Sequence, residues 1–212
     1  NSFQDLKGKT IAYQKGLPPQ FFLLYLLKKN GLSLKDIKSI DMEASAAAGA
    51  FIAQKVDAAM TWEPWLSQAG ESEHGKILVT SKEAPGLIID ILVVRPDVLA
   101  NRNKDVRKML RAWFKALNFL KSNPDEAALI MGTRLGLTTE EVKAMLLGLR
   151  FASYEDNMEY FGVNKGENRF DKAFKEAIAV WVEEGSVSKT ALEKEFKPSS
   201  PTVLKGLMSQ SE

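Results

Sequence analysis

Residues that could contact a ligand follow a short apolar segment, Val56–Met60, which is typical of a buried strand. Trp62, Glu63 and Trp65 come next, with Pro64 where it suits the first turn of a helix. Open α/β sheets hold their ligands at the carboxyl ends of strands, so a carboxylate and two indoles at this place predict a ligand site. The alternative is that both indoles are ordinary core aromatics.

The sequence contains few of the residues that covalent catalysis or metal binding requires. The 212 residues include no cysteine, which excludes disulfides, thiolate nucleophiles and thiolate metal sites. His74 is the single histidine, and its polar surroundings are typical of a solvated loop. The 29 basic and 27 acidic residues are well mixed, so nucleic acid and anionic membranes are not expected partners. We therefore expect no catalytic residue, no metal and no cofactor.

The elements that must position the site alternate between strand and helix patterns. We predict strands at residues 10–13, 38–42, 56–61, 77–80 and 87–94. We predict helices at residues 21–27 and 46–54 and from Glu63, and a short capped turn from Ser33 to Asp36. Such alternation is typical of right-handed βαβ units and a parallel sheet. Asp90 interrupts the last predicted strand, where a buried carboxylate needs a partner unless the strand emerges there.

From Arg95 onward the sequence predicts helices and no strand. The clearest helix covers residues 103–122, where apolar side chains recur at helical spacing. Further helices are predicted at residues 125–135, 138–149 and 170–184, and residues 197–201 read as loop. These amphipathic helices follow a finished α/β unit without a sheet of their own. They either form a bundle or cover strands that the chain does not contain.

Several motifs together resemble one family. They are Asp5-Leu6-Lys7-Gly8-Lys9-Thr10-Ile11-Ala12, Gly16, Leu23-Leu24 with Leu27, Gly31-Leu32-Ser33 with Asp36, Val56-Asp57-Ala58-Ala59, Trp62-Glu63-Pro64-Trp65, Ala112-Trp113, Leu117, Asn123-Pro124-Asp125-Glu126-Ala127-Ala128 and Phe151 with Glu155-Asp156-Asn157. In this order they resemble the NMT1/SsuA-like solute-binding proteins, which serve ABC importers for nitrate, sulfonates, taurine and thiamine precursors. Such proteins carry more chain before the first motif, so the sequence resembles a fragment that starts at a hinge crossing.

The resemblance implies an α/β, periplasmic-binding-protein-like fold (type 2), with two lobes and ligand in the cleft between them. Residues 1–92 would form the complete second lobe. Residues 93–212 would be a mainly helical return segment belonging to the first lobe, whose strands are missing. Apolar stripes would then be exposed in the isolated chain unless it forms an oligomer or repacks.

The resemblance also places ligand contacts at three strand ends. The nine residues are Gln14, Lys15, Gly16, Leu17, Glu43, Ala44, Ser45, Trp62 and Glu63. Sulfonate-binding relatives carry Ser or Thr after the glycine, whereas this chain has Leu17-Pro18-Pro19, which lacks those hydroxyls and two N–H donors. A sulfonate or nitrate is therefore less favoured as the ligand than in the family at large. A larger, flatter or more apolar ligand between Leu17 and Trp62 is an equal alternative.

The resemblance favours a non-enzymatic, periplasmic or extracellular binding protein (membrane-anchored in a Gram-positive host) that delivers a small molecule to an ABC permease. Candidate ligands are sulfonates, nitrate, pyrimidines and aromatic acids. A ligand-sensing domain of a membrane receptor is an alternative reading. An enzyme of the pyrimidine or menaquinone pathway is a third, and it is disfavoured because the pyrimidine synthases use a cysteine-rich motif and no base–nucleophile pair is apparent.

Overall fold

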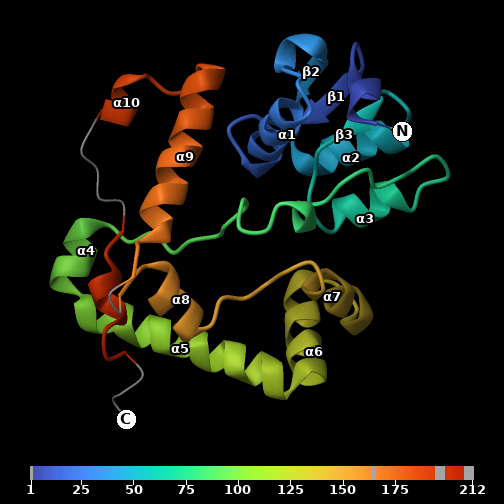
Figure 1. Cartoon of the computed structure of the whole chain (residues 1–212). Helices are drawn as coiled ribbons and strands as arrows, with labels where there is room; N and C mark the ends of the chain where they lie inside the picture. Colours follow the sequence, from blue (N-terminus) through green and yellow to red (C-terminus); the bar gives the residue numbers. More distant parts are fainter. Residues whose placement is uncertain (1, 164–165, 194–198, 208–212) are drawn as a thin grey trace. The chain divides into compact units, whose positions relative to one another are not determined.

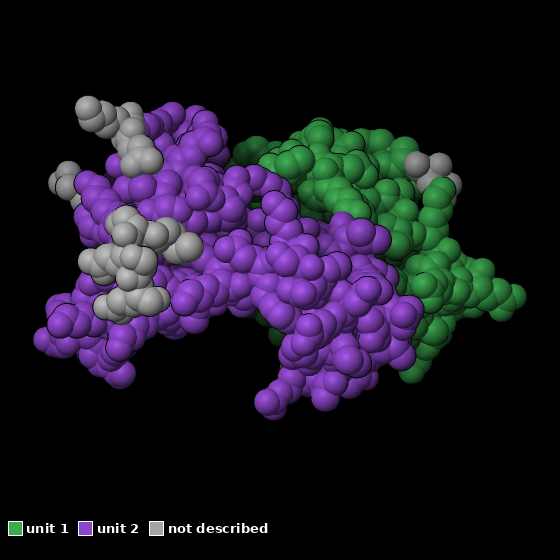
Figure 2. Space-filling model, turned by 90° about the horizontal axis from the view of Figure 1, so that it is seen from below, with its two compact units in different colours: residues 1–90, 180–187 green, residues 91–179, 188–212 purple. Residues whose placement is uncertain are grey.

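The chain divides into two compact units, each described here by itself. The computed structural model describes residues 2–163, 166–193 and 199–207 (Figure 1). Unit 1 comprises residues 1–90 and 180–187, and unit 2 comprises residues 91–179 and 188–212 (Figure 2). Unit 1 is therefore built from two stretches that are far apart in the sequence.

Unit 1 is organised around a parallel sheet. Among the residues that the structure describes, its strands are β1 (Thr10–Tyr13), β2 (Lys38–Asp41) and β3 (Ala58–Ala59), in the order β2-β1-β3. Tyr13 pairs with Asp41, and Ala12 pairs with Ala59. The predicted strands 10–13 and 38–42 are confirmed, and the predicted strand 56–61 is reduced to its two central residues. Parallel pairing brings the carboxyl ends of all three strands to one edge.

A helix covers each face of the sheet. Successive side chains of β1 alternate, so Ile11 and Tyr13 pack with Leu23 and Leu27 of α1 (Pro18–Lys29). Ala12 faces the other way and packs with Ala47 of α2 (Ala44–Ile52) and with Val56. The small side chains on that second face allow α2 to approach the sheet closely. The α/β layering predicted from the sequence is confirmed.

Two predicted strands are wrong. Residues 77–80 and 87–94 form no strand, and between them lies only the short 3₁₀ helix η3 (Ser81–Glu83). Their apolar side chains are largely exposed, with Val93 at 78%. Asp90 is exposed too, so it needs no buried partner. An apolar run becomes a strand only when neighbouring backbone completes its hydrogen bonds, and these runs have no such neighbour in the described residues.

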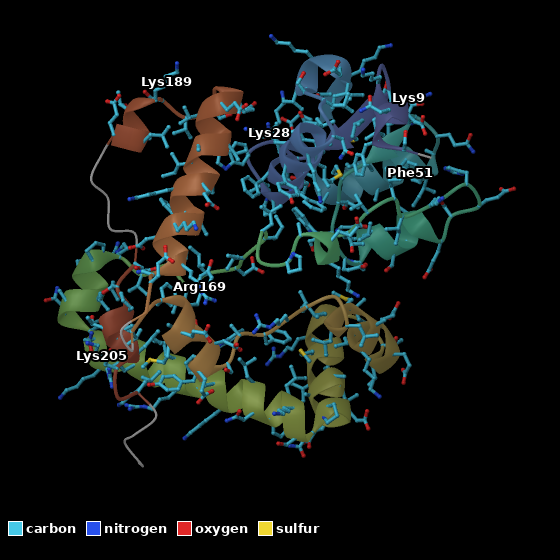
Figure 3. The ribbon with its side chains drawn as sticks, viewed as in Figure 1. Lys9, Lys28, Phe51, Arg169, Lys189 and Lys205 are labelled. Carbon is cyan, nitrogen blue, oxygen red and sulfur yellow. The ribbon has the colours of Figure 1, made fainter. Side chains whose placement is uncertain are left out.

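The rest of unit 1 consists of short elements. Helix η1 (Phe3–Leu6) precedes β1, and η2 (Leu34–Asp36) follows α1, with the predicted capping box between Ser33 and Asp36. Helix α3 (Trp65–Gly70) begins directly after Pro64. His74 is exposed, as expected for a loop, and its ring lies 5.2 Å from that of Phe51, which Figure 3 labels.

Helices are the only regular elements that the described residues of unit 2 form. Its elements are α4 (Pro96–Asn101), α5 (Asn103–Ser122), α6 (Pro124–Leu135), α7 (Thr139–Leu146), α8 (Tyr154–Tyr160), most of α9 (Arg169–Glu184), α10 (Thr190–Glu193) and η4 (Pro201–Leu204). The predicted helices 103–122, 125–135 and 170–184 are confirmed, and helix 138–149 ends three residues early. Within the predicted loop 197–201, residues 197 and 198 lie outside the described residues, and Pro201 begins η4.

A small core and several exposed apolar side chains characterise unit 2. Phe114, Leu204 and Leu207 form a buried cluster on which Tyr154 and Phe161 pack. Large apolar side chains elsewhere are exposed, as the sequence leads us to expect, namely Trp113 (52%), Leu129 (59%), Ile130 (53%) and Leu147 (79%). No helix within the described residues combines the length and the hydropathy that crossing a membrane requires.

The last turns of α9 belong to unit 1 and pack on α1. The rings of Phe21 and Trp181 lie 6.1 Å apart, and Lys28, labelled in Figure 3, forms an ion pair with Glu183. Gln20 Nε2 donates to Glu184 Oε1 over 3.2 Å. The sequence did not predict this return of residues 180–187 to the first α/β unit.

Candidate functional site

The segment that follows β1 is held tightly against its neighbours. The backbone N–H of Lys15 donates to Asp41 Oδ1 over 3.0 Å, and that of Gly16 donates to Gln20 Oε1 over 2.7 Å. Gly16 has a φ of +73°, which a residue with a side chain rarely adopts. Leu17 then caps α1 with an extended backbone and remains 39% exposed. Lys15 is exposed, and Gln14 is half-buried.

The segment that follows β2 leads directly into α2. Its start is fixed by the N–H of Met42, which donates to the carbonyl of Tyr13 over 3.2 Å. Glu43 is the N-cap residue of α2, and its side chain makes no capping hydrogen bond. Ala44 is buried (3% exposed), whereas Glu43 and Ser45 are exposed. The first turn of α2 therefore presents a carboxylate and a hydroxyl to solvent.

The segment that follows β3 carries the tryptophans. Thr61 Oγ1 donates to the carbonyl of Ala44 over 3.0 Å, which ties this segment to the start of α2. Trp62 is 41% exposed, whereas Trp65 is half-buried within α3. Glu63 Oε2 accepts a hydrogen bond from the N–H of Ser67 over 3.1 Å, so its carboxylate caps α3 and is partly occupied.

Together these segments form one surface, which we call the strand-end edge (residues 14–17, 43–45 and 62–63). The sheet register brings all nine predicted site residues to this side of unit 1, and the hydrogen bonds of Lys15 and Thr61 link the segments. The surface combines exposed apolar groups, Leu17 and Trp62, with the charges of Lys15 and Glu43. It can receive a small molecule by apolar contact and hydrogen bonding.

Three polar residues that support the strand-end edge were not predicted from the sequence. Gln20 is 2% exposed, and its polarity at the start of an otherwise apolar helix was the available signal. Asp41 ends β2, where a polar residue next to a predicted site also could have been suspected. Glu184 lies 164 residues from Gln20 in the sequence, and no local pattern could have paired them.

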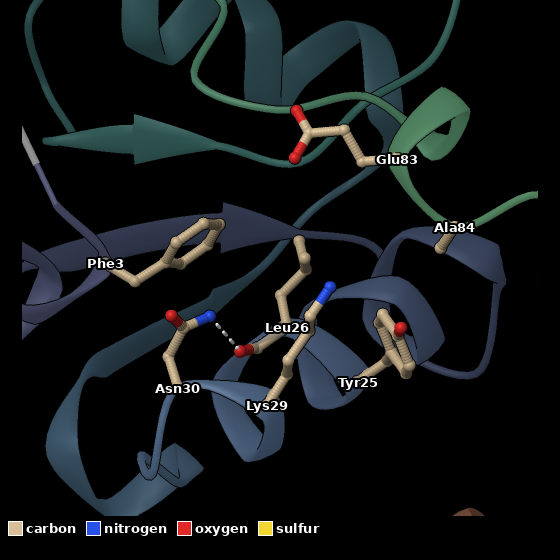
Figure 4. Close-up of a pocket in the computed structure, with 7 residues that line it drawn as sticks. All are labelled: Phe3, Tyr25, Leu26, Lys29, Asn30, Glu83 and Ala84. Carbon is tan, nitrogen blue, oxygen red and sulfur yellow. Dashed lines mark hydrogen bonds between the residues drawn. The ribbon is translucent and has the colours of Figure 1, made fainter.

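A separate shallow hollow of about 180 Å³ lies along the carboxyl-terminal half of α1 (Figure 4). It is lined by Phe3, Tyr25, Leu26, Lys29, Asn30, Glu83 and Ala84, and by none of the nine candidate residues. The Asn30 amide donates to the carbonyl of Leu26 over 2.8 Å, and Lys29 Nζ lies 5.8 Å from the centre of the Tyr25 ring. The Asn30 amide and the Lys29 ammonium are thus engaged with α1 itself. In the residues that the structure describes, no cluster of three His, Asp or Glu side chains could hold a metal ion.

Known proteins resemble this chain in sequence. A family model described as NMT1/THI5 like matches residues 1–127. A Bacillus subtilis (strain 168) protein named for binding aliphatic sulfonates is 35% identical over 125 residues, which are 59% of this chain and 38% of the relative. A protein of Brucella abortus (strain 2308) named as a binding protein is 26% identical over 129 residues, covering 59% of this chain and 40% of that protein. The chain thus spans well under half the length of these curated relatives.

Solved structures share the fold. The periplasmic aliphatic sulphonate binding protein SsuA of Escherichia coli aligns with a TM-score of 0.70 at 20% identity, over 93% of this chain and 61% of that one. The alkanesulfonate-binding protein SsuA of Xanthomonas axonopodis pv. citri, bound to MOPS, aligns with a TM-score of 0.63 at 22% identity, over 96% of this chain and 63% of that one. These likenesses confirm the predicted α/β periplasmic-binding-protein fold, and the family match covers more than half of the sequence. The chain belongs to the NMT1/THI5-like family.

Proposed function

We propose that this chain is part of a solute-binding protein of the periplasm or the cell exterior. It captures a small molecule at the strand-end edge and delivers it to an ABC permease. The observation that carries the proposal is the joining of three strand-end segments into one surface with exposed Trp62 and Leu17. A sheet of this kind holds ligands at the carboxyl ends of its strands. The relatives named for a ligand are binding proteins for aliphatic sulfonates, which supports a role without catalysis.

Ligand capture would use both kinds of group on the surface. Trp62 offers a large rigid apolar face, and Glu43 offers a carboxylate that no capping contact occupies. Unit 1 would supply one wall of the site in the complete protein. The ligand classes that remain candidates are sulfonates, nitrate, pyrimidines and aromatic acids.

The test is a thermal-shift screen of the complete protein against these four classes, followed by calorimetric titration of each hit. We expect at least one class to raise the melting temperature, because a ligand that binds only the folded protein stabilises it. Glu43→Gln should change the affinity of that hit several-fold. Glu73→Gln, which alters another exposed carboxylate away from the strand-end edge, should not. Turnover of a hit into a product, or equal effects of the two variants, would contradict the proposal.

A further inference from the structure

The inference concerns which head group the strand-end edge accepts, and it rests on the proposed function. Free backbone N–H groups at a helix N-terminus are the usual means of holding an anion. Helix α1 begins beside the strand-end edge, and its first two residues are Pro18 and Pro19, which have no N–H to offer. Of the first three helical residues, whose N–H groups have no acceptor within the helix, only Gln20 keeps a donor, and the other amide donors beside α1 must come from the residues before it.

The two amides immediately after Gln14 are already used inside the protein. The N–H of Lys15 donates to the Asp41 carboxylate, and the N–H of Gly16 donates to the Gln20 amide oxygen, over 3.0 and 2.7 Å. A sulfonate approaching here would have to break these bonds. It would also meet the negative charge of Asp41, which is exposed at the end of β2.

Gln20 cannot turn its amide away from Gly16. Its side chain is enclosed, at 2% exposure, and its Nε2 donates to Glu184 Oε1 over 3.2 Å. A carboxylate only accepts hydrogen bonds, so the NH₂ group must face Glu184 and the oxygen must face Gly16. The other oxygen of Glu184 accepts from the hydroxyl of Ser186, which fixes the carboxylate in turn. The last turn of α9 thereby sets the donor pattern of the strand-end edge.

We propose that Gln20 is a specificity-determining residue and Glu184 its positioning residue. Together with Asp41, they withhold the Lys15 and Gly16 amides from the ligand. The site therefore prefers an uncharged head group to a sulfonate. Because several relatives are named for sulfonates, the present chain would differ from them in the head group that it prefers. The preference resides in Gln20, Glu184 and Asp41, none of which is among the nine predicted contact residues.

The experiment measures the affinity of the complete protein for two pairs of probes with matched bodies, benzamide with benzenesulfonate and propanamide with ethanesulfonate, by calorimetric titration. We expect each amide to bind at least tenfold more tightly than its sulfonate partner. Gln20→Leu keeps the approximate size of the side chain and frees the Gly16 N–H, so it should move the amide-to-sulfonate affinity ratio about tenfold towards the sulfonate. A merely structural role would weaken both partners equally and leave this ratio unchanged.

Glu184 provides a second pair of variants in case Gln20→Leu does not fold. Glu184→Gln retains an oxygen that can accept from Gln20 and should preserve the ratio, whereas Glu184→Leu should shift it in the same direction as Gln20→Leu. Hydrogen exchange of the Gly16 amide, followed by NMR, should be about tenfold slower in the unaltered protein than in Gln20→Leu or Glu184→Leu.

The outcomes separate the two proposals. Tighter binding of the sulfonates, or variants that leave the ratio unchanged, would overturn the role of Gln20 while the binding function stands. Unprotected Gly16 exchange in the unaltered protein would overturn that role whether or not a ligand binds. If neither these probes nor the broader ligand screen gives any binding, the proposed function fails, and the inference fails with it.

Discussion

Ala47→Leu is the substitution that most directly tests how α2 lies on the sheet. Ala47 is 0% exposed, and its cluster partners Ala12 and Val56 are 0% and 7% exposed. A leucine adds three carbon atoms inside this buried cluster, and such overpacking typically costs about 1–3 kcal/mol. Since unit 1 contains about 100 residues, that loss corresponds to a fall in melting temperature of roughly 5–15 °C.

The assay is thermal unfolding followed by circular dichroism, with Ala46→Leu as the matched control. Ala46 is the preceding residue of the same helix and is exposed, and leucine is nearly as good a helix former as alanine. The control should therefore change stability by less than about 0.5 kcal/mol. Equal melting temperatures for the two variants would refute the close packing of α2 on β1 that positions residues 43–45.

Three further predictions concern the ligand surface and the helix caps. Trp62→Ala should weaken ligand binding about tenfold with a small change in melting temperature, whereas Trp65→Ala should mainly lower the melting temperature. The reverse result would contradict the assignment of Trp62 to the ligand surface and of Trp65 to packing. Thr138→Ala should destabilise unit 2 by about 1 kcal/mol in urea unfolding, because the Thr138 hydroxyl caps α7 by accepting from the Glu141 N–H, while Thr139→Ala is the control. Hydrogen bonds from Thr138 lower the pKa of Glu141 from its usual 4.5, so this carboxylate stabilises the folded state above pH 4.5 and loses that effect as the pH falls through the lowered value. Glu141→Gln should reduce this acid sensitivity in melts at successive pH values, and an unchanged acid profile would count against the capping role.

Local sequence signals predicted the helices and the central strand well. The capping box at Thr138 and the glycine that ends α6, Gly136 with a φ of +71°, act through neighbouring residues and can be read directly. The same signal was present but unused for α8, where Ser153 and Asp156 form a capping box. Helix α4 likewise has Pro96 in its first turn. Elements fixed by contacts within one turn are therefore predictable from the sequence.

Elements that depend on distant partners were less predictable. The apolar runs at residues 77–80 and 87–94 look like strands, but strand formation requires a neighbouring backbone that the sequence does not identify. The strand-end edge was anticipated because parallel pairing puts all strand ends on one side. Its supporting layer was not, because Gln20 meets Glu184 only through the fold.

That contact has a consequence for the newly synthesised chain. Gln20 leaves the ribosome 164 residues before Glu184, a delay of roughly 10–30 s at ordinary rates of bacterial translation. During that interval β1, β2 and the helices on them can already be present. Glu184, which orients the Gln20 amide towards Gly16, has not yet been synthesised. The nascent protein would therefore pass through a form whose Gly16 amide is open to anions, and the selectivity of the finished protein would be acquired only when residues 180–187 are in place.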